Sequence, residues 1–126
     1  MNLDGIMKSL YYKKETYFLD MFAKVKHNKT TLYNDRNNCV SEKHIEKWLL
    51  INDLLNICVY LNKDWTPNWE NKNEIKYILV AEDDRIKVEE TIYPISFAYF
   101  KTKDLANNAI EILGKDALYK ILKGEI

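Results

Sequence analysis

The run SEKHIEKWLLINDLLNICVYLN, residues 41–62, decides how the rest of the chain is interpreted. Ser41 is a favourable N-cap, and Glu42 suits the positive end of a helix dipole. Apolar residues recur at helical spacing along the run: Ile45, Trp48, Leu49, Ile51, Leu54, Leu55, Cys58 and Leu61. Four more widen that face: Leu50, Ile57, Val59 and Tyr60. A helix this apolar around its circumference is central to a fold or lies in an interface. The run therefore predicts a central helix over 41–62 and a homodimer contact through residues 42–62.

The totals predict one globular domain over residues 1–126. Hydrophobic residues make up 47% of the chain and charged residues 30%, a mixture typical of folded proteins. The 19 basic residues balance 19 acidic ones, so bulk charge does not indicate a nucleic-acid binder. No apolar run is long enough for a membrane span and the N-terminus carries no signal-like segment. We therefore expect a cytoplasmic protein of a host cell, without membrane contact.

The segment after the central helix predicts an antiparallel sheet over 75–100. Residues 77–81 form a short apolar run, and Asp83-Asp84 is a turn signal. Apolar and charged residues then alternate over 85–92, as in a strand with one solvated face. Pro94 interrupts the chain before a third apolar run at 95–100. The pattern predicts a three-stranded β-meander.

Two helices are expected over 102–123. Thr102 is a favourable N-cap for the first helix, and Gly114 is well placed to end it in the left-handed conformation. The short second helix repeats the apolar spacing with Leu118, Ile121 and Leu122. Together with the sheet, these elements predict the α+β class.

Residues 1–38 allow two interpretations. Alternation over 19–26 favours a strand, with a turn at Asn28-Lys29 and a returning strand over 30–33, which would form a β-hairpin. A helical stripe also fits this segment: Leu3, Ile6, Leu10, Tyr17 and Met21. Periodicity alone leaves both open, and residues 34–38 have the composition of a loop.

Two features are candidate partner-binding sites. Trp65 and Trp69 flank a proline turn, and such a pair either clasps the helix to the sheet or contacts a partner. The expected hairpin tip carries three carboxylates, Glu82, Asp83 and Asp84, which suit a basic partner surface. The structural clasp and a solvated turn are the ordinary interpretations of these features.

No catalytic or metal-binding pattern accompanies them. His27 and His44 are the only histidines, and neither has a nearby partner in a catalytic arrangement. Cys39 and Cys58 lack metal-ligand spacing, and three glycines provide no phosphate-binding loop. We expect no enzyme, no cofactor and no metal.

Parts of the C-terminal half resemble small proteins encoded by bacteriophages and prophages. The resemblance spans residues 60–115 and is carried by DWTPNW at 64–69, YFKTKDLA at 99–106 and AIEILG at 109–114. Those proteins are mostly of unassigned role, so the resemblance implies a phage setting and no catalytic residues.

Three functions remain in that setting. The first is stoichiometric binding to a host protein, as an inhibitor of a bacterial defence system such as an anti-CRISPR protein, with a defence nuclease as partner. The second is a nucleic-acid-binding accessory protein of phage replication or recombination, using sheet aromatics as stacking platforms: Tyr77, Tyr93, Phe97, Tyr99 and Phe100. The third is a sponge that sequesters a signalling nucleotide in a pocket of aromatic and basic groups.

Overall fold

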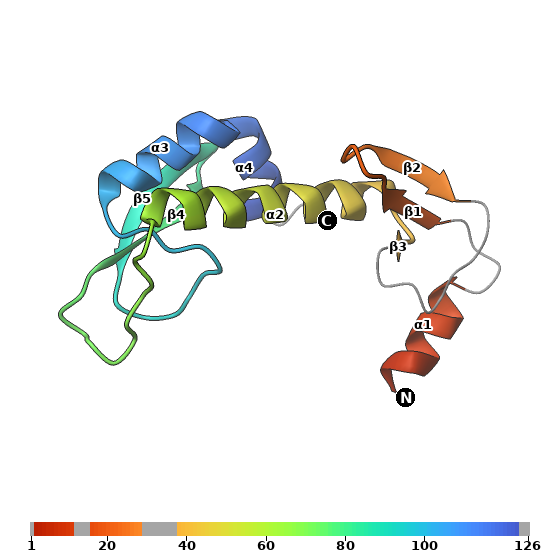
Figure 1. Ribbon diagram of the computed structural model, residues 1–126, viewed down its shortest axis with the longest axis horizontal. Coiled ribbons are helices and arrows are strands. Elements are labelled where there is room, and N and C mark those ends of the chain that lie inside the picture. Colours follow the sequence, from red (N-terminus) through yellow and green to blue (C-terminus); the bar gives the residue numbers. More distant parts are fainter. Residues whose placement is uncertain (1, 12–15, 29–37, 124–126) are drawn as a thin grey trace. The chain divides into compact units, whose positions relative to one another are not determined.

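The structure, a computed structural model, describes residues 2–11, 16–28 and 38–123. Its elements are labelled in Figure 1. They are α1 (Leu3–Tyr11), β1 (Thr16–Leu19), β2 (Val25–Asn28), β3 (Asn38–Cys39), α2 (Glu42–Asn62), β4 (Lys76–Glu82), β5 (Arg85–Thr91), α3 (Lys103–Leu113) and α4 (Lys115–Leu122). The expected α+β class is confirmed. The chain divides into two compact units, one over residues 1–49 and one over residues 50–125. The boundary between the two units falls within α2. The expectation of a single domain over residues 1–126 stays a prediction.

The first unit contains α1 and a small antiparallel sheet of strand order β2-β1-β3. The helical interpretation holds for Leu3, Ile6 and Leu10, which lie on α1, but is wrong for Tyr17 in β1 and Met21 in the following turn. A hairpin does form. The position expected for that hairpin is wrong. Strand β1 pairs with β2, and the turn lies at residues 20–24, inside the segment expected as the first strand. The Asp20 carboxylate explains this turn, since it accepts hydrogen bonds from the N–H groups of Phe22 (2.8 Å) and Lys24 (2.9 Å). Residues 30–33, expected as the returning strand, lie outside the described residues.

Helix α2 follows the expected span closely. It begins at Glu42, directly after Ser41, and continues for 21 residues to Asn62. Ile45, Leu54 and Cys58 are buried, whereas Val59 and Tyr60 are exposed. The wide apolar face of the sequence is therefore divided into a packed side and an exposed side. No helix within the described residues combines the length and apolar character that a transmembrane span needs.

The second unit is built on the β4–β5 hairpin rather than on three strands. Strands β4 and β5 pair from Lys76↔Thr91 to Glu82↔Arg85, around the expected Asp83-Asp84 turn. Both turn residues have a positive φ, 49° and 63°, as a tight two-residue turn requires. The expected third strand over 95–100 is wrong, because only Phe100 pairs with β4, through a single bridge to Tyr77.

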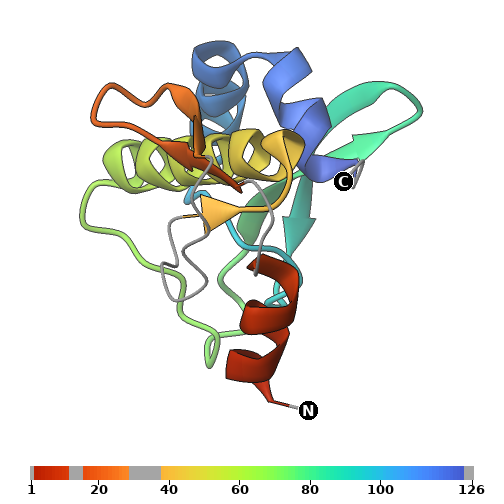
Figure 2. The same cartoon turned by 90° about the vertical axis from the view of Figure 1, so that its right-hand side faces the viewer.

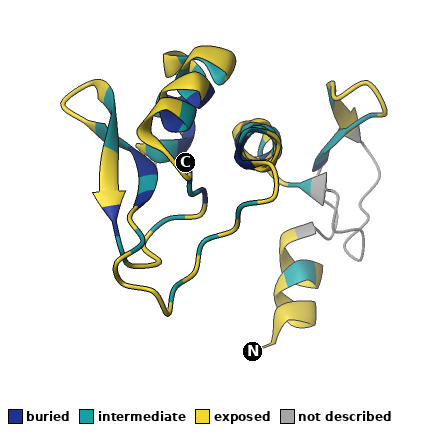
Figure 3. Ribbon diagram, turned by 60° about the vertical axis from the view of Figure 1, so that its left-hand side comes forward, coloured by how far each residue is buried: buried dark blue, intermediate teal, exposed yellow. Residues whose placement is uncertain are grey.

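Helices α3 and α4 pack against this hairpin (Figures 1 and 2). As expected, Thr102 caps α3 by accepting a hydrogen bond from the Leu105 N–H, and Gly114 ends the helix at φ 95°. Nine buried residues form the core of the unit: Leu54, Cys58, Leu79, Ala98, Phe100, Ala106, Ala109, Leu118 and Ile121. Figure 3 shows buried positions on α2, α3, α4 and β4, whereas the connecting loops are largely exposed.

Candidate functional site

A buried lysine organises the loop that joins α2 to β4. Lys76, the first residue of β4, has no exposed surface, which is unusual for a charged side chain. Its Nζ donates to the carbonyl oxygens of Asn68 at 2.7 Å and Asn71 at 3.2 Å. The Glu74 carboxylate lies 3.5 Å from the same nitrogen. The loop thus folds around one ammonium group, which adds a second donor to two carbonyls that also accept the N–H groups of Asn71 and Glu74.

Glu74 closes the loop from the other side. Its carboxylate accepts the Asn68 N–H at 2.9 Å. This hydrogen bond is the main cause that lowers the pKa of Glu74 below its ordinary 4.5, against a smaller opposing effect of desolvation. Lys76 and a hydrogen bond from the Trp65 side chain lower the pKa further. The folded loop therefore favours the ionised form of Glu74.

The two tryptophans predicted as contact residues belong to this framework. Trp69 is half-buried, with its ring 4.8 Å from the Lys76 ammonium and edge-on to the Tyr99 ring at 4.6 Å. Trp65 is also half-buried. Both indoles hold the loop in place, and their contact with a partner stays a prediction.

Two hydroxyl groups form hydrogen bonds with the backbone of the neighbouring loop, residues 92–99. The Thr91 hydroxyl accepts the Tyr93 N–H at 3.0 Å and donates to the Tyr93 carbonyl at 3.1 Å. The Tyr99 hydroxyl likewise accepts the Ser96 N–H and donates to the Ser96 carbonyl, both at 2.6 Å. The two bonds to Ser96 occupy backbone groups that the expected strand over 95–100 would have used for pairing. The bonds to Tyr93 fix the residues just before it.

Helix α2 supports the same loop through Asn62. Its side-chain nitrogen donates to the Tyr99 carbonyl at 2.7 Å, and its side-chain oxygen accepts the Lys101 N–H at 3.0 Å. The Cys58 thiol donates to the same Tyr99 carbonyl at 2.9 Å. Burial raises the pKa of Cys58, although these hydrogen bonds partly oppose the shift. Both ends of the loop are therefore attached to the scaffold.

The fixed loops present large apolar side chains to solvent. Ile75 is 44% exposed, Tyr93 54%, Ile95 68% and Phe97 42%. We call these four residues the loop patch. Ile75 and Tyr93 line one hollow of about 370 Å³, and Lys72 lies 5.7 Å from the Tyr93 ring centroid. Rigid loops that carry exposed aromatic and aliphatic side chains are typical of contact surfaces, so the loop patch is the candidate functional site.

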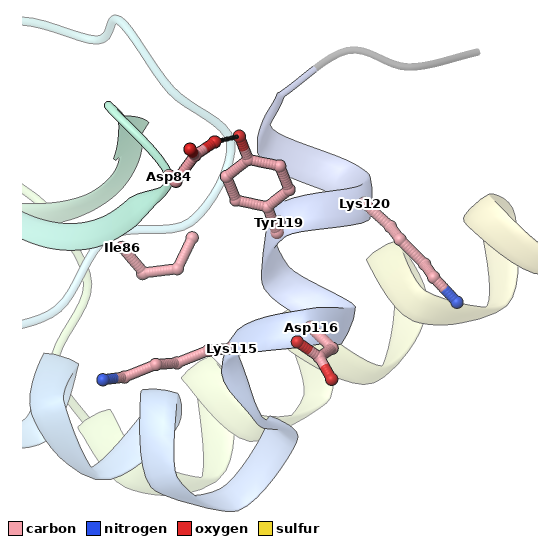
Figure 4. Close-up of a pocket in the computed structure, with 6 residues that line it drawn as sticks. All are labelled: Asp84, Ile86, Lys115, Asp116, Tyr119 and Lys120. Atoms are coloured by element: carbon pink, nitrogen blue, oxygen red, sulfur yellow. Dashed lines mark hydrogen bonds between the residues drawn. The ribbon is translucent and has the colours of Figure 1, made fainter.

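The predicted acidic site lies at the other end of β4. Glu82, Asp83 and Asp84 are all exposed on the β4–β5 turn, and β4 has seven residues, so the turn is about 20 Å from the tryptophan loop. Asp84 accepts a hydrogen bond from the Tyr119 hydroxyl at 2.6 Å (Figure 4). Its carboxylate also lies 4.0 Å from the Lys123 ammonium. The structure does not bring the two predicted sites together.

A hollow of about 510 Å³ adjoins that turn, with Lys115, Asp116 and Lys120 in its lining. Figure 4 shows Lys115 and Lys120 pointing away from each other, so their charges do not converge on one point. The described residues also contain no group of three or more His, Cys, Asp or Glu side chains that could hold a metal ion.

The tryptophans and the acidic residues were the candidate contacts selected from the sequence. Four exposed apolar residues were missed: Ile75, Tyr93, Ile95 and Phe97. Tyr93 and Phe97 were expected on a sheet as stacking aromatics, and both lie on a loop instead. Pro94 directly before the apolar run was the available signal, because proline, like the residues of turns, often marks the limit of a paired strand. Comparisons of the chain with protein-family models, curated proteins and solved structures give no match.

Proposed function

We propose that this chain acts by stoichiometric binding to a host protein through the loop patch. The observation that carries the proposal is the outward presentation of Ile75, Tyr93, Ile95 and Phe97 by loops whose backbones are hydrogen-bonded to buried groups. A surface already held in its binding conformation loses little conformational entropy on association. Aromatic side chains on such a surface commonly dominate the binding energy.

The charged neighbours of the loop patch favour a protein over a nucleic acid. Lys72 lies against the Tyr93 ring, and Glu90 lines the hollow beside Ile75 and Tyr93, so charges of both signs occur next to the loop patch. Single-stranded nucleic acid instead needs a positively charged track beside its stacking platforms. An apolar centre with a mixed polar rim is the usual composition of a protein interface.

The phage resemblance of residues 60–115 provides the class of partner. Both loops fall within that range. Small phage proteins without catalytic groups often inhibit host factors, so we propose a bacterial defence nuclease as the first partner to test. In this role the chain blocks its target by occupancy and performs no chemistry.

The test is capture of host proteins on the tagged full chain from nuclease-treated lysate, followed by mass spectrometry. Three proteins are compared: the unchanged chain, Ile95→Ser in the loop patch, and Ile112→Ser as a matched control. Ile112 lies on α3 and is 58% exposed, close to the 68% of Ile95. We expect one stoichiometric host protein to be retained by the unchanged chain and the control, and lost with Ile95→Ser.

The identified protein is then purified and titrated by calorimetry. We expect Tyr93→Ala to weaken binding by about 30-fold, the effect of a typical interface hot spot. A partner retained equally by all patch variants would contradict the loop patch. Nucleic acid recovered only from untreated lysate, with binding that weakens steeply with salt, would favour the replication accessory instead.

A further inference from the structure

A hollow that the protein-binding proposal does not use lies between the end of α2 and the start of α3. It has a volume of about 670 Å³, within the range of small-molecule sites. Lys63, Asp64 and Trp65 line it from the residues after α2, and Lys101 and Thr102 line it from the residues before α3. An aromatic ring, two cations and one carboxylate therefore surround the same space.

Trp65 provides a flat apolar wall. Its backbone N–H donates to the Asn62 carbonyl at 3.1 Å, which fixes the residue one turn after α2. Its side chain is also one of the groups that lower the pKa of Glu74, whose carboxylate accepts the Asn68 N–H. The indole is half-buried and lines the hollow. Such a ring suits the face of a planar heteroaromatic base.

Lys63 and Lys101 provide the positive charge. The two residues are joined through Asn62, which precedes Lys63 in the chain and accepts the Lys101 N–H at 3.0 Å. Both side chains are exposed, and neither forms an ion pair in the part of the chain that the structure describes. Lysine ammonium groups in this position are available to a phosphate.

Asp64 distinguishes this hollow from a simple anion site. Its exposed carboxylate lies between Lys63 and Trp65 in the sequence and lines the same space. A carboxylate repels a free phosphate but accepts hydrogen bonds from sugar hydroxyls or from an exocyclic amine. A ligand that satisfies all these groups must combine a base, hydroxyl groups and a phosphate.

We propose that the hollow binds a nucleotide, with its base stacked on Trp65, its phosphate held by Lys63 and Lys101, and its sugar hydroxyls or exocyclic amine bound by Asp64. This site does not depend on the loop patch or on a host protein. The same chain can therefore bind a nucleotide whether or not it blocks a partner.

The backbone offers an unusually clean test variant. Lys63 has φ 56°, a left-handed conformation that glycine adopts without strain. Lys63→Gly therefore removes the ammonium while keeping the fold. Lys115→Ala is the matched control, because it removes one exposed lysine from a different hollow.

The experiment is a set of three separate titrations of the full chain, with AMP, adenosine and inorganic phosphate, each monitored by ¹H–¹⁵N NMR. We expect AMP to shift the Trp65 indole signal and the amide signals of Lys63 and of Lys101 to Leu105. Adenosine should shift the Trp65 signal with about tenfold weaker affinity, and phosphate should bind more weakly still. Lys63→Gly should weaken AMP binding by about tenfold, and Trp65→Leu by about tenfold or more, whereas Lys115→Ala should leave it unchanged.

Several results would overturn the proposal. One is the absence of AMP-dependent shifts around the hollow at millimolar concentration. Another is AMP binding that survives in Lys63→Gly and Trp65→Leu, because the ligand would then sit elsewhere. Equal affinity for phosphate and AMP would remove the role of Trp65. The signals of residues far from the hollow report whether each variant is folded, and Lys63→Gly tests the site even where Trp65→Leu fails to fold.

Discussion

The ammonium of Lys76 lies 4.8 Å from the centroid of the Trp69 ring and has no contact with solvent. This pair joins the loop after α2 to the first residue of β4. Trp69 in turn meets the Tyr99 ring, whose hydroxyl group binds the backbone of Ser96. A continuous set of contacts therefore connects the buried lysine to the loop that carries Tyr93, Ile95 and Phe97.

Replacement of Lys76 by methionine should destabilise the second unit. The change keeps the buried volume but removes one of the two donors to each of the Asn68 and Asn71 carbonyls and leaves Glu74 without its counter-charge. We expect the free energy of unfolding to fall by about 3 kcal/mol, measured by urea denaturation with near-UV circular dichroism. Lys72→Met is the control, because Lys72 is exposed and its ammonium lies over the Tyr93 ring; it should change stability by less than about 1 kcal/mol. Equal effects of the two variants would contradict this role of Lys76.

The ionisation of Glu74 should make the same loop sensitive to acid. The pKa of this carboxyl is lowered in the folded protein, so its stabilising effect is complete above the ordinary value of 4.5. The effect is lost as the pH falls through the lower, folded value. We expect the stability difference between the unchanged chain and Glu74→Gln to be constant near neutral pH and to narrow below 4.5. A difference that does not vary with pH would show that the charge of Glu74 is unimportant.

Local signals in the sequence were sufficient for several elements. The N-caps and spacing of residues 41–62 and 102–123 predicted α2, α3 and α4, and Asp83-Asp84 predicted the turn between β4 and β5. These features depend on neighbours within a few residues. Short-range propensity therefore decides them.

The errors arose where a single side chain binds backbone groups only a few residues away and so prevents strand pairing. In the expected third strand, the Tyr99 hydroxyl binds both the N–H and the carbonyl of Ser96, and the segment forms a loop instead. The first hairpin turns early because the Asp20 carboxylate binds two backbone N–H groups. No periodicity reveals either competition.

The candidate site was hidden for a related reason. A lysine is normally expected on the surface, so Lys76 gave no sign that a loop folds around it. The exposed state of Ile95 likewise depends on how the loop is anchored, which an apolar run cannot show. Sequence reasoning singled out the tryptophan segment, but not the exposed residues of the neighbouring loop.

Removal of the Asn62 side chain should loosen the loop patch from the side of α2. Asn62→Ala leaves the Lys101 N–H without its acceptor and removes one donor from the Tyr99 carbonyl. We expect a loss of about 2 kcal/mol in stability and faster amide hydrogen exchange over residues 95–101. Asn56→Ala, an exposed change on the same helix, should alter stability by less than about 0.5 kcal/mol. Unchanged exchange in the loop would contradict the anchoring role of Asn62.

Asp84 combines an unfavourable backbone conformation with a favourable side-chain contact, and substitutions can separate the two. Its φ of 63° suits glycine, whereas its carboxylate accepts the Tyr119 hydroxyl at 2.6 Å. Asp84→Ala loses the contact and keeps the strain, so it should be less stable than Asp84→Gly by about 1 kcal/mol in urea denaturation. In a Tyr119→Phe background the contact is already absent, and Asp84→Gly should then stabilise the protein by about 0.5 kcal/mol. If Asp84→Gly has the same effect in both backgrounds, the hydrogen bond to Tyr119 contributes nothing to stability.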